Sequence, residues 1–135
     1  MSNAPLETVI HVLLVEDHAL LRGILVQTLT AAGHRVTAAE SADQAIALIE
    51  GGARPDLLLS DIRMPGRLNG LDLARLVRQR YPSVAILLQT GFAEFDTIDF
   101  PVLHKPFDSD TIQAAIRDVL AVRAHDLGAG KAQGI

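Results

Sequence analysis

Short apolar runs alternate along this chain with segments whose apolar residues recur at helical spacing. The apolar runs are rich in β-branched residues and predict strands over 9–15, 35–39, 56–60, 84–89 and 101–104. The helical segments cover 19–32, 41–50, 70–80 and a last stretch that begins at 108 or 109. Ser41 begins a capping-box sequence, and Asp108 or Ser109 is a suitable N-cap for the last helix.

The predicted strands are almost wholly apolar and do not alternate between apolar and polar residues. This pattern is typical of a parallel sheet that is buried on both faces, and the alternation of strands with helices favours the same arrangement. Right-handed crossovers then give a doubly wound α/β fold, a five-stranded parallel sheet with helices on both faces. In such a fold the ligand crevice lies at the carboxyl ends of the strands.

Composition narrows the class of protein further. The chain has 135 residues, of which 49% are hydrophobic and 21% are charged, with a net charge of −4. There is no cluster of lysine and arginine, so we expect no direct binding to nucleic acid. There is no cysteine, which excludes disulfides, thiolate metal sites and thiol catalysis.

The termini and the apolar runs bear on location and domain organisation. No apolar run approaches the roughly 20 residues that span a membrane, and residues 1–8 do not resemble a signal peptide. We therefore expect a cytoplasmic protein with no membrane association. We expect one domain over 9–122, an N-terminal extension at 1–8, and a flexible tail at 123–135, where the sequence is polar and glycine-rich.

Charged residues follow three of the predicted strands. Glu16 and Asp17 come directly after the first strand, Asp61 after the third, and Lys105 after the last. Parallel strands end at the same edge of a sheet, so these side chains are expected to meet. Two carboxylates about 5 Å apart repel by roughly 3 kcal/mol at an effective dielectric near 20, so a cation is needed among them.

The residue types at this edge point to phosphoryl chemistry. Mg²⁺ prefers oxygen ligands and is often held by one or two carboxylates together with a phosphate. A carboxylate beside Mg²⁺ can act as a nucleophile, while a lysine neutralises the charge on the phosphoryl group. Thr90, at the end of the fourth strand, can donate its hydroxyl to a phosphate oxygen.

Five short motifs, in order along 9–122, resemble the receiver domain of two-component response regulators. Any one of the motifs is weakly specific, but all of them in register are very specific. They are Leu14-Val15-Glu16-Asp17, Leu59-Ser60-Asp61-Ile62-Arg63-Met64-Pro65-Gly66, Asn69-Gly70-Leu71, Leu88-Gln89-Thr90-Gly91 and Lys105-Pro106-Phe107.

The resemblance implies a role for each matching residue. It implies a flavodoxin-like sheet of order 2-1-3-4-5, with Asp61 as the phosphoacceptor. Glu16 and Asp17 would hold Mg²⁺ directly or through water, together with Asp61 and the backbone carbonyl of Arg63. Thr90 and Lys105 would contact the phosphoryl group, and the Lys105–Pro106 peptide bond would be cis, as is common in the family.

Two departures from the family pattern lie between the last two strands. The position three residues before Lys105 is usually aromatic and here is Val102, which puts an aromatic switch in its usual place in doubt. The spacing from Thr90 to Lys105 is also short, so we expect the helix in 91–100 to be short or irregular. The Thr-Gly pair after the fourth strand is similar to receivers of hybrid sensor kinases and to a stand-alone subtype.

The resemblance implies a signalling receiver that catalyses only its own phosphorylation and dephosphorylation. A sensor histidine kinase or a histidine phosphotransfer protein would phosphorylate Asp61, and a conformational change would then reach a downstream protein. With no output domain in the sequence, a phosphate shuttle or sink is a further expectation, and a homodimer is another because receivers often pair.

Two alternatives remain at this point. A haloacid-dehalogenase-like phosphatase also uses an aspartyl nucleophile after a strand, but it needs a second acid two residues later, where this chain has Arg63. A receiver-like interaction module that no longer takes phosphate is disfavoured by the complete set of site residues, yet the unusual segment 91–100 keeps it open.

Overall fold

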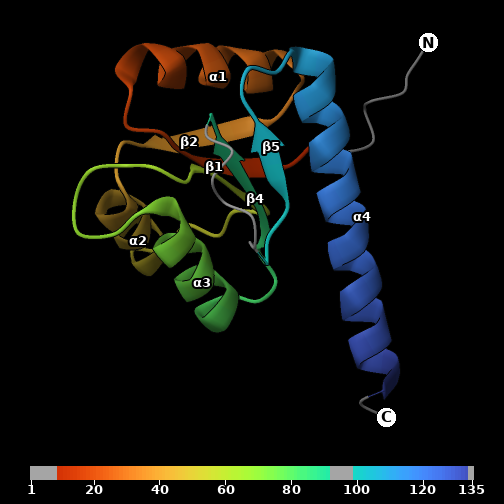
Figure 1. Cartoon of the computed structure of the whole chain (residues 1–135). Coiled ribbons are helices and arrows are strands. Elements are labelled where there is room, and N and C mark those ends of the chain that lie inside the picture. The colour runs from red at the N-terminus through yellow and green to blue at the C-terminus, as the bar shows by residue number, and fades with distance from the viewer. Residues whose placement is uncertain (1–8, 92–98, 134–135) are drawn as a thin grey trace.

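The computed structural model describes residues 9–91 and 99–133, with only the backbone described for 124–133. Its strands form one parallel sheet of five, in the order β2-β1-β3-β4-β5 (Figure 1). The strands are β1 (His11–Val15), β2 (Arg35–Ala39), β3 (Leu57–Asp61), β4 (Ala85–Thr90) and β5 (Val102–His104). The helices are α1 (Ala19–Ala31), α2 (Ala42–Glu50), α3 (Gly70–Arg80) and α4 (Ser109–Gln133). The predicted doubly wound fold and its strand order are confirmed.

Two apolar cores lie on opposite faces of the sheet. One core packs α2 and α3 against residues such as Leu58 and Leu88, and the other packs α1 and α4 against residues such as Leu59 and Leu87. Successive strand residues point to opposite faces, so a strand covered on both sides must be apolar at every position. This explains the unbroken apolar runs in the sequence.

The helices begin at side-chain caps that satisfy free backbone N–H groups. The Ser41 hydroxyl accepts from the backbone N–H of Gln44 at 3.1 Å. Asn69 and Asp72 form a complete capping box at the start of α3. Of the two candidates for the last helix, Asp108 is the cap, since its carboxylate accepts from the N–H of Thr111 at 2.8 Å. Each cap contributes about 1 kcal/mol to helix stability.

The last helix is longer than the sequence predicted. The backbone is helical to Gln133, within the stretch 123–135 for which the sequence predicted a flexible tail. No proline follows Pro106, and alanine is frequent after residue 120, which favours continuation of the helix through the two poor helix formers Gly128 and Gly130. The division of the chain at 122 stays a prediction.

The expected short or irregular helix between β4 and β5 falls mainly on 92–98, which lie outside the described residues. The described residues on either side of this gap, 91 and 99–101, are not helical. Across 9–91 and 99–133, no helix combines the length and the apolar composition needed to cross a membrane.

Candidate functional site

Polar side chains replace apolar ones at the carboxyl ends of four adjacent strands. The rows that face α1 and α4 consist of buried apolar residues: Val12 and Leu14 on β1, Leu57 and Leu59 on β3, Ala85 and Leu87 on β4, and Leu103 on β5. By the alternation of strand residues, these rows continue into Glu16, Asp61, Gln89 and Lys105. The fold therefore brings these four residues to one edge of the sheet.

Three carboxylates meet at this edge. Glu16, Asp17 and Asp61 each offer an oxygen, and these atoms all lie within 4.8 Å of one another. Glu16 is only 1% exposed and Asp61 is 8% exposed, whereas Asp17 faces solvent. The cluster is thus open on the side of Asp17 and closed behind Glu16.

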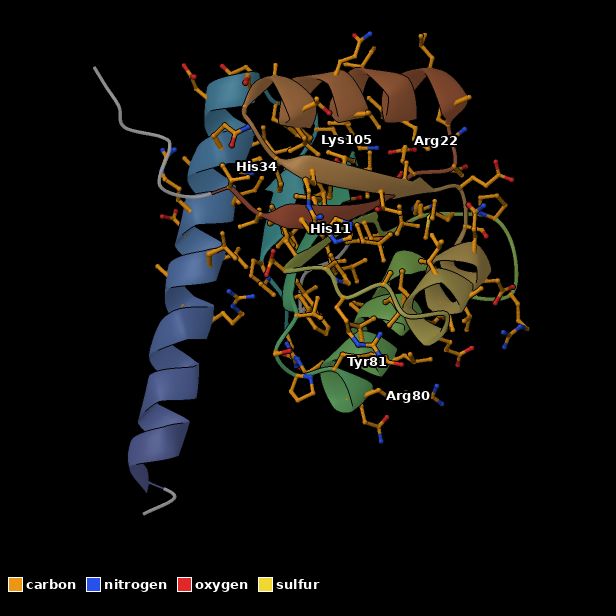
Figure 2. The ribbon with its side chains drawn as sticks, turned by 180° about the vertical axis from the view of Figure 1, so that it is seen from behind. His11, Arg22, His34, Arg80, Tyr81 and Lys105 are labelled. Carbon is orange, nitrogen blue, oxygen red and sulfur yellow. The ribbon has the colours of Figure 1, made fainter. Side chains whose placement is uncertain are left out.

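Lys105 joins the two buried acids. Its Nζ lies 3.2 Å from Oδ2 of Asp61 and 3.3 Å from Oε1 of Glu16. The peptide bond that follows it, Lys105–Pro106, is cis, as the resemblance implied. Figure 2 shows Lys105 close to α1, with Arg80 and Tyr81 at the far end of the molecule.

Glu16 receives three hydrogen bonds from the described residues, which come from three parts of the chain. Its Oε1 accepts from Lys105 and from Nε2 of Gln89 at 3.3 Å, and its Oε2 accepts from the backbone N–H of His18 at 3.1 Å. Burial raises the pKa of Glu16 above its ordinary value, and the neighbouring charge of Asp61 raises it too. The His18 and Lys105 contacts oppose this rise.

Backbone contacts fix the two acidic segments in place. The guanidinium of Arg22, on α1, donates to the carbonyl of Glu16 at 2.8 Å and to that of Asp17 at 3.4 Å. The N–H of Gly70 donates to the carbonyl of Ile62 at 2.8 Å. A Cβ on Gly70 would lie 1.9 Å from the carbonyl oxygen of Asp61, so only glycine lets α3 begin this close to β3.

The remaining predicted residues lie around the same edge. Thr90 is fully buried at the end of β4, and its carbonyl accepts from the N–H of Lys105 at 2.8 Å. Arg63 lies two residues after Asp61 with an exposed side chain, beside Asn69 in a shallow hollow. Val102 begins β5 opposite Leu88.

Sequence reasoning missed the parts played by Gln89, Arg22 and His18. Gln89 carried a signal, because it is a polar residue at the end of a strand that is otherwise apolar. His18 caps α1 through Nδ1, which accepts from the N–H of Leu21 at 3.3 Å. No pattern in the sequence marks Arg22, because its target is a backbone carbonyl.

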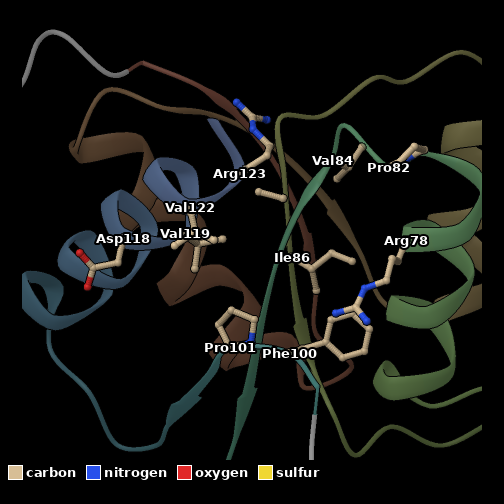
Figure 3. Close-up of a pocket in the computed structure, with 11 residues that line it drawn as sticks. Arg78, Pro82, Val84, Ile86, Phe100, Pro101, Asp118, Val119, Val122 and Arg123 are labelled. Carbon is tan, nitrogen blue, oxygen red and sulfur yellow. The ribbon is translucent and has the colours of Figure 1, made fainter. Parts of the chain in front are cut away.

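A separate pocket of about 390 Å³ lies away from this edge, between α4, the start of β4 and the end of α3 (Figure 3). Its walls include Ile86, Phe100 and Val122, with Arg78 and Arg123 at its sides. No residue of the acidic cluster lines this pocket. The candidate metal and phosphoryl site therefore lies at the carboxyl edge of the sheet and does not include this pocket.

The fold and the carboxyl edge define a class of doubly wound α/β proteins with an acid cluster and a lysine at the strand ends. The sequence model of the response regulator receiver domain matches residues 12–117. The chain therefore belongs to the response regulator receiver domain family, whose members act in two-component signalling and for which phosphorylation and Mg²⁺ binding are typical.

Curated relatives support the family assignment over only part of their own length. The transcriptional regulator NtrC of Salmonella typhimurium is 32% identical over 114 residues, 79% of this chain and 24% of that protein. The response regulator FleR of Pseudomonas aeruginosa is 41% identical over 85 residues, 63% of this chain and 18% of that protein. The chain thus spans about a quarter or less of these two relatives.

Solved receiver structures match this chain over nearly their whole length. A response regulator receiver protein from Sinorhizobium medicae superposes with a TM-score of 0.77 at 32% identity, covering 87% of this chain and 98% of that one. The chemotaxis response regulator CheY4 of Vibrio cholerae gives a TM-score of 0.74 at 28% identity, covering 83% of this chain and 99% of that one.

Proposed function

We propose that this receiver accepts a phosphoryl group on Asp61 in a Mg²⁺-dependent reaction. The donor is a phosphohistidine on a sensor histidine kinase or on a histidine phosphotransfer protein. The observation that carries the proposal is the junction of Asp61 with Lys105, at 3.2 Å, beside a cluster of three carboxylates within 4.8 Å. One lysine does not neutralise three acids, so the edge favours a further cation.

The donor set fits Mg²⁺. Carboxylates of Glu16, Asp17 and Asp61 and the backbone carbonyl of Arg63 are all hard oxygen ligands, which Mg²⁺ prefers over nitrogen or sulfur. These groups would hold the ion directly or through water. When bound, Mg²⁺ neutralises charge on the phosphoryl oxygens and on the nucleophile.

The chemical step assigned to the chain is an in-line displacement at phosphorus. A carboxylate oxygen of Asp61 forms the new P–O bond while the P–N bond to the donor histidine breaks, and the electron pair leaves with the imidazole nitrogen. The ammonium of Lys105 and the hydroxyl of Thr90 stabilise the charge that develops on the phosphoryl oxygens. The same Asp61 then holds an acyl phosphate.

The proposed output is a protein partner. Lys105 bridges Glu16 and Asp61 in the present arrangement, and a phosphoryl group on Asp61 offers it a new anionic contact. The backbone N–H of Lys105 donates to the carbonyl of Thr90 at 2.8 Å, so this lysine is connected to the end of β4 as well as to β5. This links the site to the segment between β4 and β5, and we place the chain in the cytoplasm with its kinase.

Phosphorylation by a small donor tests the proposal. The chain is incubated with phosphoramidate or acetyl phosphate and Mg²⁺, and its intact mass is measured. We expect a gain of one phosphoryl group that needs Mg²⁺ and is lost in Asp61→Asn. Asp43→Asn is the matched control, because Asp43 is an exposed acid on α2 paired with Arg67.

Two results would contradict the proposal that Asp61 accepts a phosphoryl group. If the chain gains no phosphoryl group from either donor or from a histidine phosphotransfer protein, and binds no Mg²⁺, it is not a phosphoacceptor. The fold would then serve as a phosphorylation-independent interaction module. A gain that persists in Asp61→Asn would move the acceptor to another residue.

A further inference from the structure

Gln89 lies within the site, although the proposed reaction gives it no part. It is fully buried on β4, where it pairs in register with Asp61 of β3 on one side and Leu103 of β5 on the other. Its Nε2 donates to Oε1 of Glu16 at 3.3 Å. The same oxygen accepts from Nζ of Lys105 at 3.3 Å.

The other end of the Gln89 amide has no partner. Its Oε1 is buried and finds no hydrogen-bond donor among the described residues. A buried acceptor without a donor is costly, and native proteins keep few of them. The residues that precede Gln89 in the same row of β4, Ala85 and Leu87, are apolar and carry no such cost.

The orientation of the amide follows from the charge of Glu16. With the amide reversed, Oε1 of Gln89 would face a carboxylate oxygen, and two acceptors would repel each other. The observed orientation gives Glu16 a donor and leaves the amide oxygen unpaired. If the position served packing alone, an apolar residue would fill it without the unpaired oxygen.

We propose that Gln89 is a positioning residue that holds Glu16 for the bound cation, independently of Lys105. This inference rests on the proposed function. Once Lys105 pairs with a phosphoryl group on Asp61, Oε1 of Glu16 loses one of its two donors. Among the described residues, the amide of Gln89 donates to Glu16 and to no other side chain, so it keeps that oxygen in place, while the N–H of His18 holds Oε2.

Metal binding tests this role without any phosphoryl transfer. Mn²⁺ serves as the probe, since it prefers oxygen ligands as Mg²⁺ does, and the free ion is measured by EPR with the 135-residue chain. Gln89→Met keeps the length of the side chain and removes the donor. We expect Mn²⁺ binding to weaken about tenfold, within the usual cost of removing a hydrogen-bond partner from a metal ligand. The free energy of unfolding in urea should change little, because the substitution removes the unpaired buried oxygen together with the donor.

Two further variants make the test specific. Gln113→Met makes the same change at a glutamine on α4 that bonds His34 at 3.2 Å and also carries an unpartnered buried atom, and we expect it to leave Mn²⁺ binding unchanged. In a Glu16→Ala background, Gln89→Met should have no further effect, because the oxygen on which it acts is absent.

Several results would overturn the inference. One is a folded Gln89→Met that binds Mn²⁺ as tightly as the wild type, and another is an equal loss in the Glu16→Ala background. Failure of both Gln89→Met and Gln89→Leu to fold would make the residue structural. A wild type that neither binds Mn²⁺ nor takes phosphate would contradict the proposed function as well. A wild type that does both, together with a Gln89→Met variant that binds Mn²⁺ equally well, would contradict only this inference.

Discussion

Gly70 shows how one residue without a side chain can determine the geometry of the site. Replacing it with alanine would place a Cβ 1.9 Å from the carbonyl oxygen of Asp61 and 2.9 Å from Cα of Ile62. Both contacts are with backbone, so α3 or the end of β3 must move. We expect Gly70→Ala to destabilise the fold by about 1–3 kcal/mol, the usual cost of overpacking, and to slow phosphorylation of Asp61.

Gly23→Ala is the matched control for that prediction. Gly23 lies in α1, is exposed, and an added Cβ would meet nothing within 4 Å. Alanine there should stabilise the helix by roughly 0.5–1 kcal/mol. Urea unfolding of both variants measures the effect, and equal stabilisation by the two substitutions would contradict the close approach at Gly70.

Among individual residues, the sequence predicted some members of the site and missed others, and the difference has a physical reason. Glu16, Asp61 and Lys105 are charged residues that directly follow apolar runs, so the alternation of strands places them without further information. Gln89 is neutral and acts on another side chain across two strands, which only the three-dimensional register reveals. The roles of all these residues, and those of Asp17 and Thr90, rest on the proposed function.

Among the elements, α4 departs most from what the sequence predicted. Its first part packs on the sheet through Ile112, Ile116 and Val119, and that part was recognisable from apolar spacing. The continuation to Gln133 lies past these apolar contacts. Helical continuation of this kind depends on residue propensity and on the absence of proline, and neither leaves a periodic pattern for sequence reasoning to detect. Gly128 and Gly130 pointed away from a helix here.

Arg123 connects α4 by hydrogen bonds to the end of the sheet opposite the cluster of Glu16, Asp17 and Asp61. Its Nη1 donates to the carbonyls of Asp56 at 3.0 Å and Ser83 at 3.1 Å, just before β3 and β4 begin (Figure 3). We expect Arg123→Met to lower the free energy of unfolding by about 1–2 kcal/mol, because two hydrogen bonds are lost. The carbonyl of Asp56 still accepts from the N–H of Ala85 in this variant. Arg117→Met, which changes an exposed arginine on the same helix, should change it by less than about 0.5 kcal/mol.

Amide hydrogen exchange distinguishes a local effect of Arg123 on α4 from a loss of stability in the whole fold. Amides of α4 around Val119 should exchange faster in Arg123→Met, while those of β1 and β3 should follow only the global unfolding free energy. Uniform acceleration over all strands and helices would instead mean that Arg123 contributes to the whole core. Phosphorylation of Asp61 should be unaffected, because Arg123 lies at the other end of the sheet.

The whole molecule carries the cost of an acid cluster whenever no cation is bound. Glu16 is the group through which that cost appears, because burial raises its pKa above the ordinary value of 4.5. Below that pH, Glu16 is protonated in both the folded and the unfolded states and contributes no difference. As the pH rises, the unfolded chain releases its proton first, so metal-free protein loses stability until the raised pKa is passed.

Glu16→Gln tests this account across the pH range. Without Mg²⁺, we expect the variant to be more stable than the wild type at pH 7, by on the order of 1 kcal/mol. The difference should shrink as the pH falls from the raised pKa of Glu16 toward 4.5, and it should be absent below that pH. Mg²⁺ should stabilise the wild type more than the variant, because it binds the folded state and relieves the repulsion there. Thermal unfolding at several pH values, with Mg²⁺ and with EDTA, measures both effects. A variant that is less stable than the wild type at pH 7 in EDTA would contradict this prediction. It would mean that the hydrogen bonds to Glu16 stabilise the fold by more than burial of its charge destabilises it.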